Sequence, residues 1–221
     1  MKKNKVVIFG IEDYAELAHY YLEKDSVYEV VGFCVHEKYL PLEKLFHGLP
    51  VTAFENAVKD YPPSQFKFFA PMSPVNMNGL REKIYYEIKA KGYELISYIS
   101  SKATLCDNII GDNCFILEDN TLQPFTVIGN NVVLWSGNHI GHHSIIKDHV
   151  TFTSHVVMSG HCVIGENSFL GVNATLRDGI ILAKGTLVGM ASSVTRNTEE
   201  WGVYIGNPAK KIEGKLSSSV M

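Results

Sequence analysis

The sequence of 221 residues lacks several features that mark common classes of protein. No stretch approaches the roughly 18 uninterrupted apolar residues of a membrane span, and the first ten residues lack the apolar core of a signal peptide. Basic residues are not in excess, because 20 Lys and Arg stand against 23 Asp and Glu for a formal net charge of -3. We therefore expect a cytoplasmic protein whose main partner is neither a nucleic acid nor a membrane.

Cysteine is scarce and is not spaced for metal binding or redox chemistry. The four cysteines, Cys34, Cys106, Cys114 and Cys162, form no CxxC pair and none of the spacings of metal fingers. We therefore predict reduced thiols that serve packing. What remains, 46% hydrophobic and 19% charged residues, is enough for one large or two small globular domains.

Up to about residue 99, apolar runs alternate with amphipathic stretches. Strands are predicted at residues 5–10, 28–35, 66–72 and 93–99, and helical segments at 12–25, 54–61 and 75–91. Strands that alternate with helices predict a small parallel sheet, and such sheets bind ligands at the carboxyl ends of their strands. A pocket is therefore expected near Gly10, His36 and Pro71.

From residue 110 the pattern changes to a strict repeat of six. Large apolar residues recur fifteen times without a miss, at Ile110, Ile116, Leu122, Ile128, Leu134, Ile140, Ile146, Phe152, Met158, Ile164, Leu170, Leu176, Leu182, Val188 and Val194. Four residues later the side chain is mostly small, as at Cys114 and Ala174. This alternation is what a triangular coil of short parallel strands requires, with 18 residues a turn and about five turns about 4.8 Å apart. The position of the small residue is taken by asparagine at Asn120 and Asn138, which are 18 residues apart. We therefore predict a buried ladder of hydrogen-bonded amides rather than a catalytic pair.

This half resembles the hexapeptide-repeat acyltransferases, whose coil is a left-handed parallel β-helix. The small N-terminal α/β domain and the ending "GVYIGNPAKKI" resemble the branch that acylates sugars, which includes nucleotide-amino-sugar N-acetyltransferases and sialic-acid O-acetyltransferases. The resemblance covers essentially the whole chain. It implies a substrate- or nucleotide-binding α/β domain over residues 1–99, a β-helical catalytic domain over 100–198, and a tail over 199–221 near the coenzyme A site.

The resemblance implies an enzyme that transfers acetyl, or another short acyl group, from coenzyme A to a sugar during the synthesis of surface glycans or polysaccharides, and the expected acceptor is a nucleotide-linked amino sugar. It also implies a homotrimer, because the catalytic groove of this fold is assembled between neighbouring coils. Two alternatives stay open, namely an O-acetyltransferase of the sialic-acid type and a non-catalytic β-helical binding module. Nucleotidyltransferases with a β-helical tail are excluded, because the long glycine- and arginine-bearing loop that they need after the first strand is absent.

Six of the nine histidines lie within residues 134–165. The same slot in successive hexads holds His143, His149, His155 and His161, but positions six apart face three directions and only His143 and His161 stack. These four histidines therefore cannot gather around one metal ion on a single chain. The β-helical carbonic anhydrases use two histidines five residues apart, and this chain has no such pair. We predict no metal, and we expect exposed or partly packed side chains for His149, His155 and His161.

The resemblance assigns catalysis to one neutral imidazole, which takes the proton of the acceptor's amine or hydroxyl as that group attacks the thioester. An imidazole, with a usual pKa of about 6.5, suits this role. Counted back from "FLGVNA", His142 falls at the position of the base, and Gly160 falls one turn above, where the family uses a backbone N–H to hold the thioester oxygen. His143 stands where an orienting acid usually follows the base, so the orienting group stays open. His139 is the alternative base.

The family binds acyl-coenzyme A along the groove between coils, largely through backbone groups. Candidates for these contacts are Gly171, Asn173, Gly189 and Ala191, with plain corner positions as the alternative for each. The tail lies by the adenine end in relatives, which makes Asn207, Pro208, Lys210 and Lys211 further candidates.

Relatives also hold a nucleotide's phosphates with a glycine-rich turn after the first strand. This chain keeps Gly10 but has Asp13 and Ala15 in place of the later glycines, and His36 where relatives often place an acid. The substrate-binding candidates are therefore Gly10, Asp13, His36 and Pro71. The domain either binds a different nucleotide sugar or serves as a structural cap.

Overall fold

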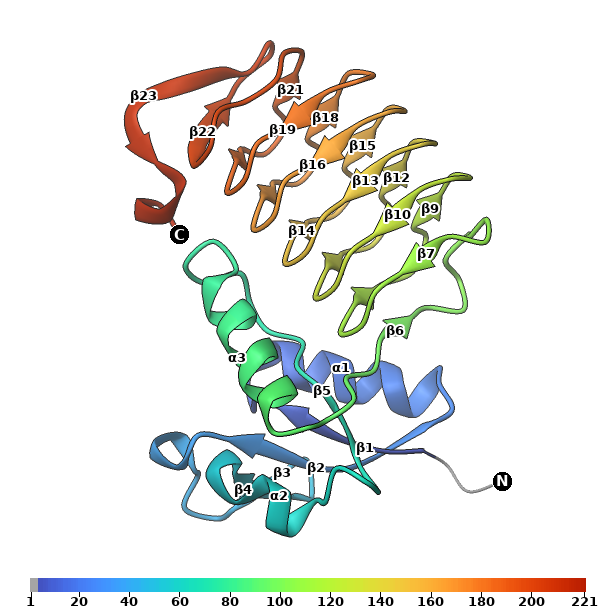
Figure 1. Ribbon diagram of the computed structural model, residues 1–221, viewed down its shortest axis with the longest axis vertical. Helices are drawn as coiled ribbons and strands as arrows, with labels where there is room; N and C mark the ends of the chain where they lie inside the picture. Colours follow the sequence, from blue (N-terminus) through green and yellow to red (C-terminus); the bar gives the residue numbers. More distant parts are fainter. Residues whose placement is uncertain (1–3) are drawn as a thin grey trace.

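The computed structural model describes residues 4–221, and it consists of an N-terminal α/β sheet and a coil of short strands, with helix α3 running toward the coil (Figure 1). The N-terminal elements are β1 (Asn4–Phe9), α1 (Asp13–Lys24), β2 (Tyr28–Val35), η1 (Glu37–Tyr39), β3 (Leu45–Phe46), β4 (Leu49–Ala53), η2 (Phe54–Asn56), α2 (Ala57–Asp60), β5 (Lys67–Phe69) and α3 (Gly79–Ala90). The strand order is β3-β4-β2-β1-β5, parallel except for β3. None of the helices in the described residues has the length and apolar character needed to span a membrane.

The coil consists of two-residue strands that stack in three sheets. These are β6 (Tyr98–Ile99), β7 (Ile109–Ile110), β8 (Phe115–Ile116), β9 (Thr121–Leu122), β10 (Val127–Ile128), β11 (Val133–Leu134), β12 (His139–Ile140), β13 (Ile145–Ile146), β14 (Thr151–Phe152), β15 (Val157–Met158), β16 (Val163–Ile164), β17 (Phe169–Leu170), β18 (Thr175–Leu176), β19 (Ile181–Leu182), β20 (Leu187–Val188) and β21 (Ser193–Val194). The tail adds β22 (Gly202–Ile205), β23 (Lys210–Leu216) and η3 (Ser217–Ser219). We name the sheets by their early strands: the β7 sheet (β7, β10, β13, β16, β19), the β9 sheet (β9, β12, β15, β18, β21) and the β8 sheet (β6, β8, β11, β14, β17, β20, β22, β23).

The predicted left-handed parallel β-helix is confirmed. Strands 18 residues apart pair in parallel, as Ile128 does with Ile146, and each of the fifteen repeating apolar residues is the second residue of a strand. All of them except Ile110 are buried, and they form one continuous core. The amide ladder is also present, because Asn138 Nδ2 donates to Asn120 Oδ1 at 2.9 Å.

The N-terminal part covers the outer face of the β8 sheet. Apolar residues of α1 form one buried cluster with Phe115 and Val133 of that sheet, while α2 and α3 cover the other face of the N-terminal sheet. Arg81 of α3 is fully buried at the contact, where it donates to Thr151 Oγ1 at 3.0 Å and to the His149 carbonyl at 3.1 Å. Burial lowers the pKa of Arg81 to about 10, so the guanidinium still carries its charge at neutral pH.

Two predictions about elements are wrong. The strand expected over residues 93–99 reduces to β6, which pairs with β8 of the coil, while Leu95 makes a single bridge to Phe68. The chain has to leave the N-terminal sheet here to begin the first turn of the coil. The helix expected from residue 75 begins at Gly79, because residues 76–78 adopt positive φ angles of 53°, 50° and 67°. Strands β3 and β4 were not expected from the sequence.

Candidate active site

His142 lies at the corner of residues 141–144, between β12 and β13, which we call the β12–β13 corner. Its side chain is exposed, and its backbone N–H donates to Gln123 Oε1 at 3.0 Å. In a three-sided coil this corner joins the β9 sheet to the β7 sheet. It is therefore the corner that the β8 sheet, with the N-terminal part on it, does not touch.

The absence of a side chain at two glycines lets this corner pack closely: Gly160 leaves space for the His142 ring, and Gly141 leaves space for the backbone of the next turn. A Cβ on Gly160 would lie 2.7 Å from His142 Cε1 and 3.0 Å from its Nε2, so the ring rests directly against the Gly160 backbone. A Cβ on Gly141 would lie 2.5 Å from the Gly160 nitrogen. Within residues 4–221 the Gly160 N–H donates to no acceptor. The corner thus places an imidazole beside an available backbone N–H, the adjacency expected from the repeat.

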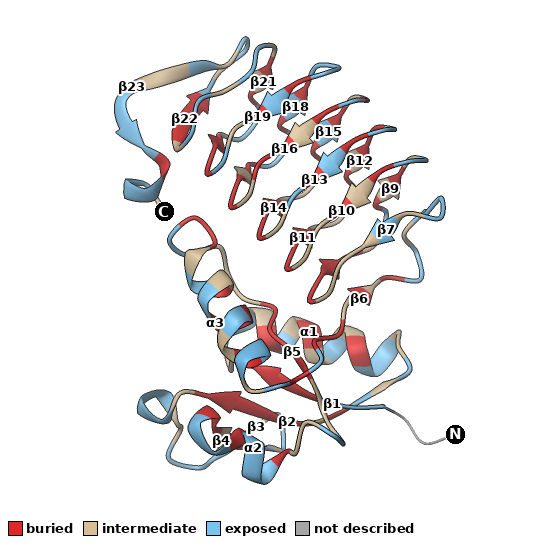
Figure 2. Ribbon diagram, viewed as in Figure 1, coloured by how far each residue is buried: buried red, intermediate tan, exposed pale blue. Residues whose placement is uncertain are grey.

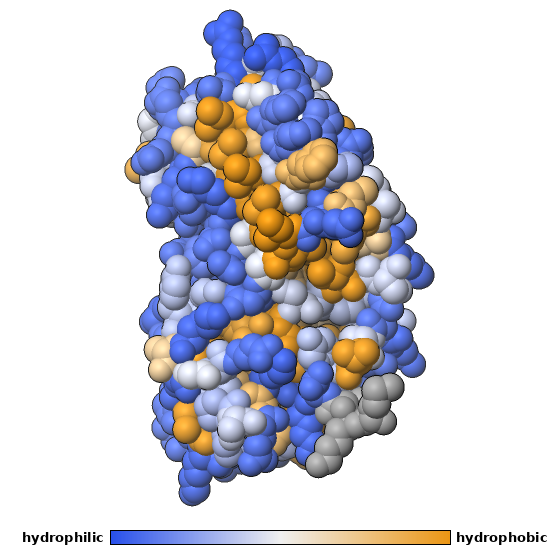
Figure 3. All heavy atoms as spheres, turned by 45° about the vertical axis from the view of Figure 1, so that its right-hand side comes forward, coloured by the Kyte–Doolittle hydropathy of each residue, from blue (hydrophilic) through white to orange (hydrophobic). Residues whose placement is uncertain are grey.

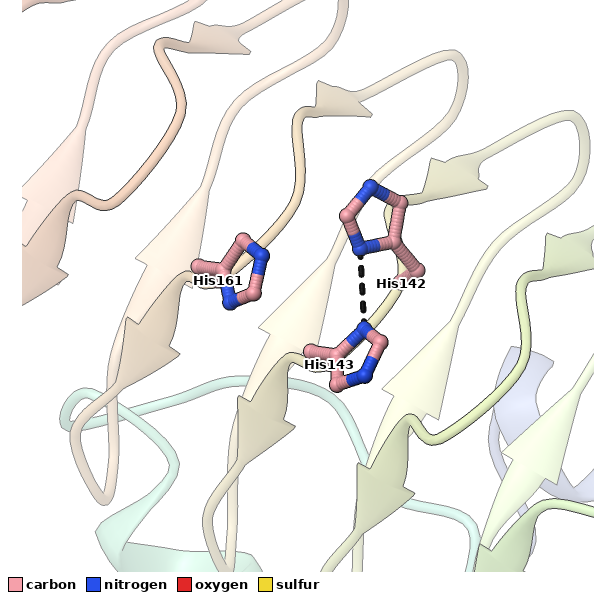
Figure 4. A group of neighbouring side chains, drawn as sticks. All are labelled: His142, His143 and His161. Carbon is pink, nitrogen blue, oxygen red and sulfur yellow. Dashed lines mark hydrogen bonds between the residues drawn. The ribbon is translucent and has the colours of Figure 1, made fainter.

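His143 is the hydrogen-bonding partner of the His142 ring. The two Nδ1 atoms lie 3.0 Å apart, and Figure 4 shows both rings together with His161. His143 and His161 adopt positive φ angles of 55° and 56° and stack at 5.0 Å between ring centroids, as predicted for residues 18 apart. Phe125, one turn below, continues this column with its ring centroid 4.6 Å from that of His143.

The remaining three histidines of residues 134–165 lie outside the β12–β13 corner. His139 is the first residue of β12, on the face of the β9 sheet, so it precedes the corner. His155 is exposed at a different corner, between the β8 and β9 sheets. His149 was expected to be exposed or partly packed, but it is 2% exposed, because Tyr85 and Tyr86 of α3 pack edge-on against its ring.

Burial lowers the pKa of His149, while Glu82, 3.8 Å from its Nε2, acts in the opposite direction. Asn131 Nδ2 lies 2.8 Å from His149 Nδ1, so a neutral His149 accepts a hydrogen bond from the residue 18 positions earlier. The ring therefore belongs to the packing between α3 and the coil.

The candidate coenzyme A residues lie on the opposite edge of the β9 sheet from His142. Gly171, Asn173, Gly189 and Ala191 belong to successive turns of the corner between the β8 and β9 sheets. A Cβ on Gly171 would lie 2.5 Å from the Met190 nitrogen, so coil stacking alone requires a glycine there.

The tail turn packs beside that corner. Ala209 N–H donates to the Ser193 carbonyl, and the turn exposes Asn207 and Pro208. Lys210 is exposed, whereas Lys211 forms an ion pair with Glu199, with 2.5 Å between Lys211 Nζ and Glu199 Oε2. The structure therefore brings the tail candidates next to the later corner candidates, but not next to His142 within one chain.

The N-terminal candidates divide between two hollows. Gly10, Asp13 and Pro71 line a hollow of about 410 Å³ at the carboxyl ends of β1 and β5, together with Tyr14. Burial raises the pKa of Tyr14, whose hydroxyl accepts a hydrogen bond from Trp135 Nε1 at 3.2 Å. His36 instead faces a second hollow, where its ring nitrogens lie 3.0 Å from Glu55 and 3.2 Å from Glu87.

An apolar band runs along the coil on the outer face of the β7 sheet. Its members are the first residues of the five strands: Ile109, Val127, Ile145, Val163 and Ile181. The first, third and fifth are 69%, 44% and 48% exposed, and the two valines are half-buried. Figure 2 shows the mixed exposure of these strands, and Figure 3 shows the diagonal band. A continuous apolar strip of this kind is typical of a contact surface.

Solved structures share this arrangement over nearly the whole chain. A variant of perosamine N-acetyltransferase from Caulobacter crescentus, with one histidine replaced by asparagine and in complex with CoA and GDP-perosamine, matches with a TM-score of 0.81 at 20% identity, over 94% of this chain and 96% of its own. The acetyltransferase domain of PglB from Neisseria gonorrhoeae, in complex with acetyl coenzyme A, matches with a TM-score of 0.83 at 21% identity, over 96% of this chain and 100% of its own.

WeeI from Acinetobacter baumannii matches with a TM-score of 0.77 at 18% identity, over 94% of this chain and 99% of its own. No protein-family model matches the chain. These likenesses establish the fold.

Two residues of the corner were not predicted from the sequence. Gln123 and Gly141 were not singled out, although Gly141 stands 18 residues before Ser159 and the repeat would have stacked it beneath the Ser159–Gly160 peptide. The repeat also did not bring His142 into contact with His161, because that contact depends on the direction of an exposed side chain.

Proposed function

We propose that this protein is an acetyltransferase that moves an acetyl group from acetyl-CoA to a nucleotide-linked amino sugar, as a step in glycan synthesis. The observation that carries the proposal is the contact of the His142 imidazole with Gly160, whose N–H is available at the same corner. A base beside an unpaired backbone donor is what acyl transfer to an amine needs.

The chemistry follows from these two groups. The acceptor amine attacks the thioester carbonyl and forms a C–N bond, while His142 takes a proton from the nitrogen. The Gly160 N–H donates to the carbonyl oxygen as that oxygen becomes negative. The C–S bond then breaks, and the imidazolium returns its proton to the leaving thiolate, so the products are the amide and free CoA.

His143 acts as a positioning residue for the base. For His142 Nε2 to keep its lone pair for the acceptor, its Nδ1 must carry the ring hydrogen and donate it to His143 Nδ1, 3.0 Å away. Neutral His143, with its own hydrogen on Nε2, can accept that bond. A second imidazole thus takes the place of the acid that the resemblance implies.

The hollow lined by Gly10, Asp13 and Pro71 is the proposed acceptor site. It lies at the carboxyl ends of parallel strands, the usual ligand position in such sheets. The similar structures support the substrate class, because one of them is a complex with CoA and GDP-perosamine and another is a complex with acetyl coenzyme A. We assign the two last turns of the corner between the β8 and β9 sheets, at Gly171 and Gly189, with the tail turn beside them, to the donor.

One chain cannot complete this site, so the proposal includes a homotrimer. The N-terminal hollow is carried on the β8 sheet, and His142 lies at the one corner that this sheet does not touch. The apolar band on the β7 sheet runs along the coil beside this corner, and a neighbouring coil could pack against it. Covering the band buries Ile and Val side chains, each worth about 1.5–3 kcal/mol when fully buried.

The test is turnover against a panel of acceptors. Purified protein with acetyl-CoA is offered GDP-, UDP- and dTDP-linked amino sugars and, in parallel, free sugars and sugars that carry only hydroxyls, and released CoA is followed with a thiol reagent. Acetylation of a nucleotide-linked amine supports the proposal. Transfer only to hydroxyls would make the protein an O-acetyltransferase, and failure to bind acetyl-CoA would leave a binding module.

A further inference from the structure

Three imidazoles meet at the β12–β13 corner, and the transfer chemistry uses only two of them. One ring nitrogen from each of His142, His143 and His161 lies within 4.8 Å of the others, and the closest pair is 3.0 Å apart. The centroid of the His142 ring lies 5.1 Å from that of His143 and 5.0 Å from that of His161. Figure 4 shows the three rings lying together, and all three side chains are exposed in the single chain.

The coil holds this group in place through its backbone. His143 and His161 occupy one slot in adjacent turns, and the His161 N–H donates to the His142 carbonyl at 2.9 Å. The positive φ angles of His143 and His161 turn both side chains the same way, so their rings stack with an interplanar angle of 18°. His142 enters from the preceding position, because Gly160 leaves space for its ring.

These distances suit a small transition-metal ion. Zinc takes histidine nitrogens at about 2.0–2.1 Å in a tetrahedron, which places neighbouring nitrogens about 3.3 Å apart. The ring nitrogens lie within 4.8 Å of one another, and the His143 and His161 rings are nearly parallel, so these exposed side chains have to turn before their lone pairs point at one ion. Water is then the fourth ligand. The group contains only imidazoles, so it favours Zn²⁺, Cu²⁺ or Ni²⁺ over Mg²⁺ and Ca²⁺, which prefer oxygen.

We propose that His142, His143 and His161 form a site for a divalent transition-metal ion, and that the bound ion stops acyl transfer. The second half rests on the proposed function. A metal ion on either nitrogen of His142 removes the base, because the ion either takes Nε2 directly or takes Nδ1 and leaves the ring hydrogen on Nε2. The ion is therefore an inhibitor that competes with the proton being transferred, not a cofactor.

The binding test uses full-length protein treated with a chelator, desalted and titrated with ZnCl₂ by calorimetry. A Cys106→Ser background removes the exposed thiol, which is itself a zinc ligand. We expect one ion per chain, at least about 10-fold weaker binding in His161→Gln, and no response to MgCl₂. His155→Gln is the matched control, because His155 is an exposed histidine with a similar φ of 60° at another corner. Co²⁺ gives a second readout through the visible absorption of a four-coordinate ion.

Equal zinc affinity in His161→Gln and His155→Gln, or no binding by the parent protein, would overturn the metal site whatever the protein catalyses.

The inhibition test compares turnover with and without saturating zinc within each variant. We expect zinc to abolish turnover in the parent and in His155→Gln, and His161→Gln to require at least about 10-fold more zinc. Zinc that binds the parent without slowing it would overturn the inhibitory half. Zinc binding by a protein that acetylates no acceptor would support the site and count against the proposed function.

Discussion

Replacing Gly160 with alanine tests whether the contact between Gly160 and His142 sets the position of the base. The backbone of Gly160 lies outside the left-handed region, so alanine brings no backbone strain there, and the N–H is retained. The added Cβ would lie 2.7 Å from His142 Cε1, whereas ordinary contacts begin at 3.4 Å, so the ring must retreat by about 0.7 Å or more. A misplacement of about 1 Å in a catalytic group costs up to about 100-fold in rate.

We therefore expect Gly160→Ala to lower kcat by about 10- to 100-fold, equivalent to about 1.4–2.7 kcal/mol in the activation free energy. The affinity for acetyl-CoA should change little, because the displaced group acts on the acceptor. Initial rates of thiol release give kcat, and calorimetry gives the affinity for acetyl-CoA. Gly79→Ala is the control, because its Cβ would meet nothing closer than 3.8 Å. A Gly160→Ala enzyme with kcat within twofold of the parent and an unchanged melting temperature would show that this contact does not position the base.

Three further predictions concern the base His142, the apolar band and the buried His149. His142→Ala should lower kcat by about 10²–10⁴ in the thiol-release assay, while His155→Ala should cost less than about twofold, and equal losses would remove His142 as the base. Light scattering should give about three times 24.6 kDa for the parent and for Val157→Asp, but a smaller mass for Ile145→Asp, because both residues are 44% exposed and only Ile145 belongs to the apolar band. Burial lowers the pKa of His149, so the unfolded chain binds the proton more readily; stability is full above about pH 6.5 and falls as the pH drops below it. Between pH 7.5 and 5.5, the free energy of unfolding measured with urea should fall less in His149→Asn than in the parent. An equal fall in both proteins would contradict this role of His149.

The coil could be predicted from the sequence because its geometry is repetitive. A period of six with three legs a turn fixes which residues pair, so the stack of His143 on His161 and the position of Gly160 above His142 follow from counting by 18. These relations depend only on backbone register. The amide ladder of Asn120 and Asn138 followed in the same way.

Contacts between distant parts of the chain could not be predicted in this manner. Nothing in the spacing indicated that Arg81 would be buried against Thr151, or that α3 would cover His149, because these contacts depend on how two separate units dock. The group of three histidines was missed for a different reason. Register stacks His143 on His161, but His142 reaches this pair only through the direction of its own side chain. That side chain lies at an exposed corner, and register alone does not set its direction.

The role of His142 as the base in acetyl transfer is best tested by a single-turnover transfer of labelled acetyl from acetyl-CoA to a nucleotide-linked amino sugar, with enzyme in excess. This measurement isolates the chemical step from substrate binding and product release. We expect label to appear on the sugar amine with the parent enzyme, and at least about 100-fold more slowly with His142→Ala. Transfer at the same rate by both proteins would exclude His142 as the base.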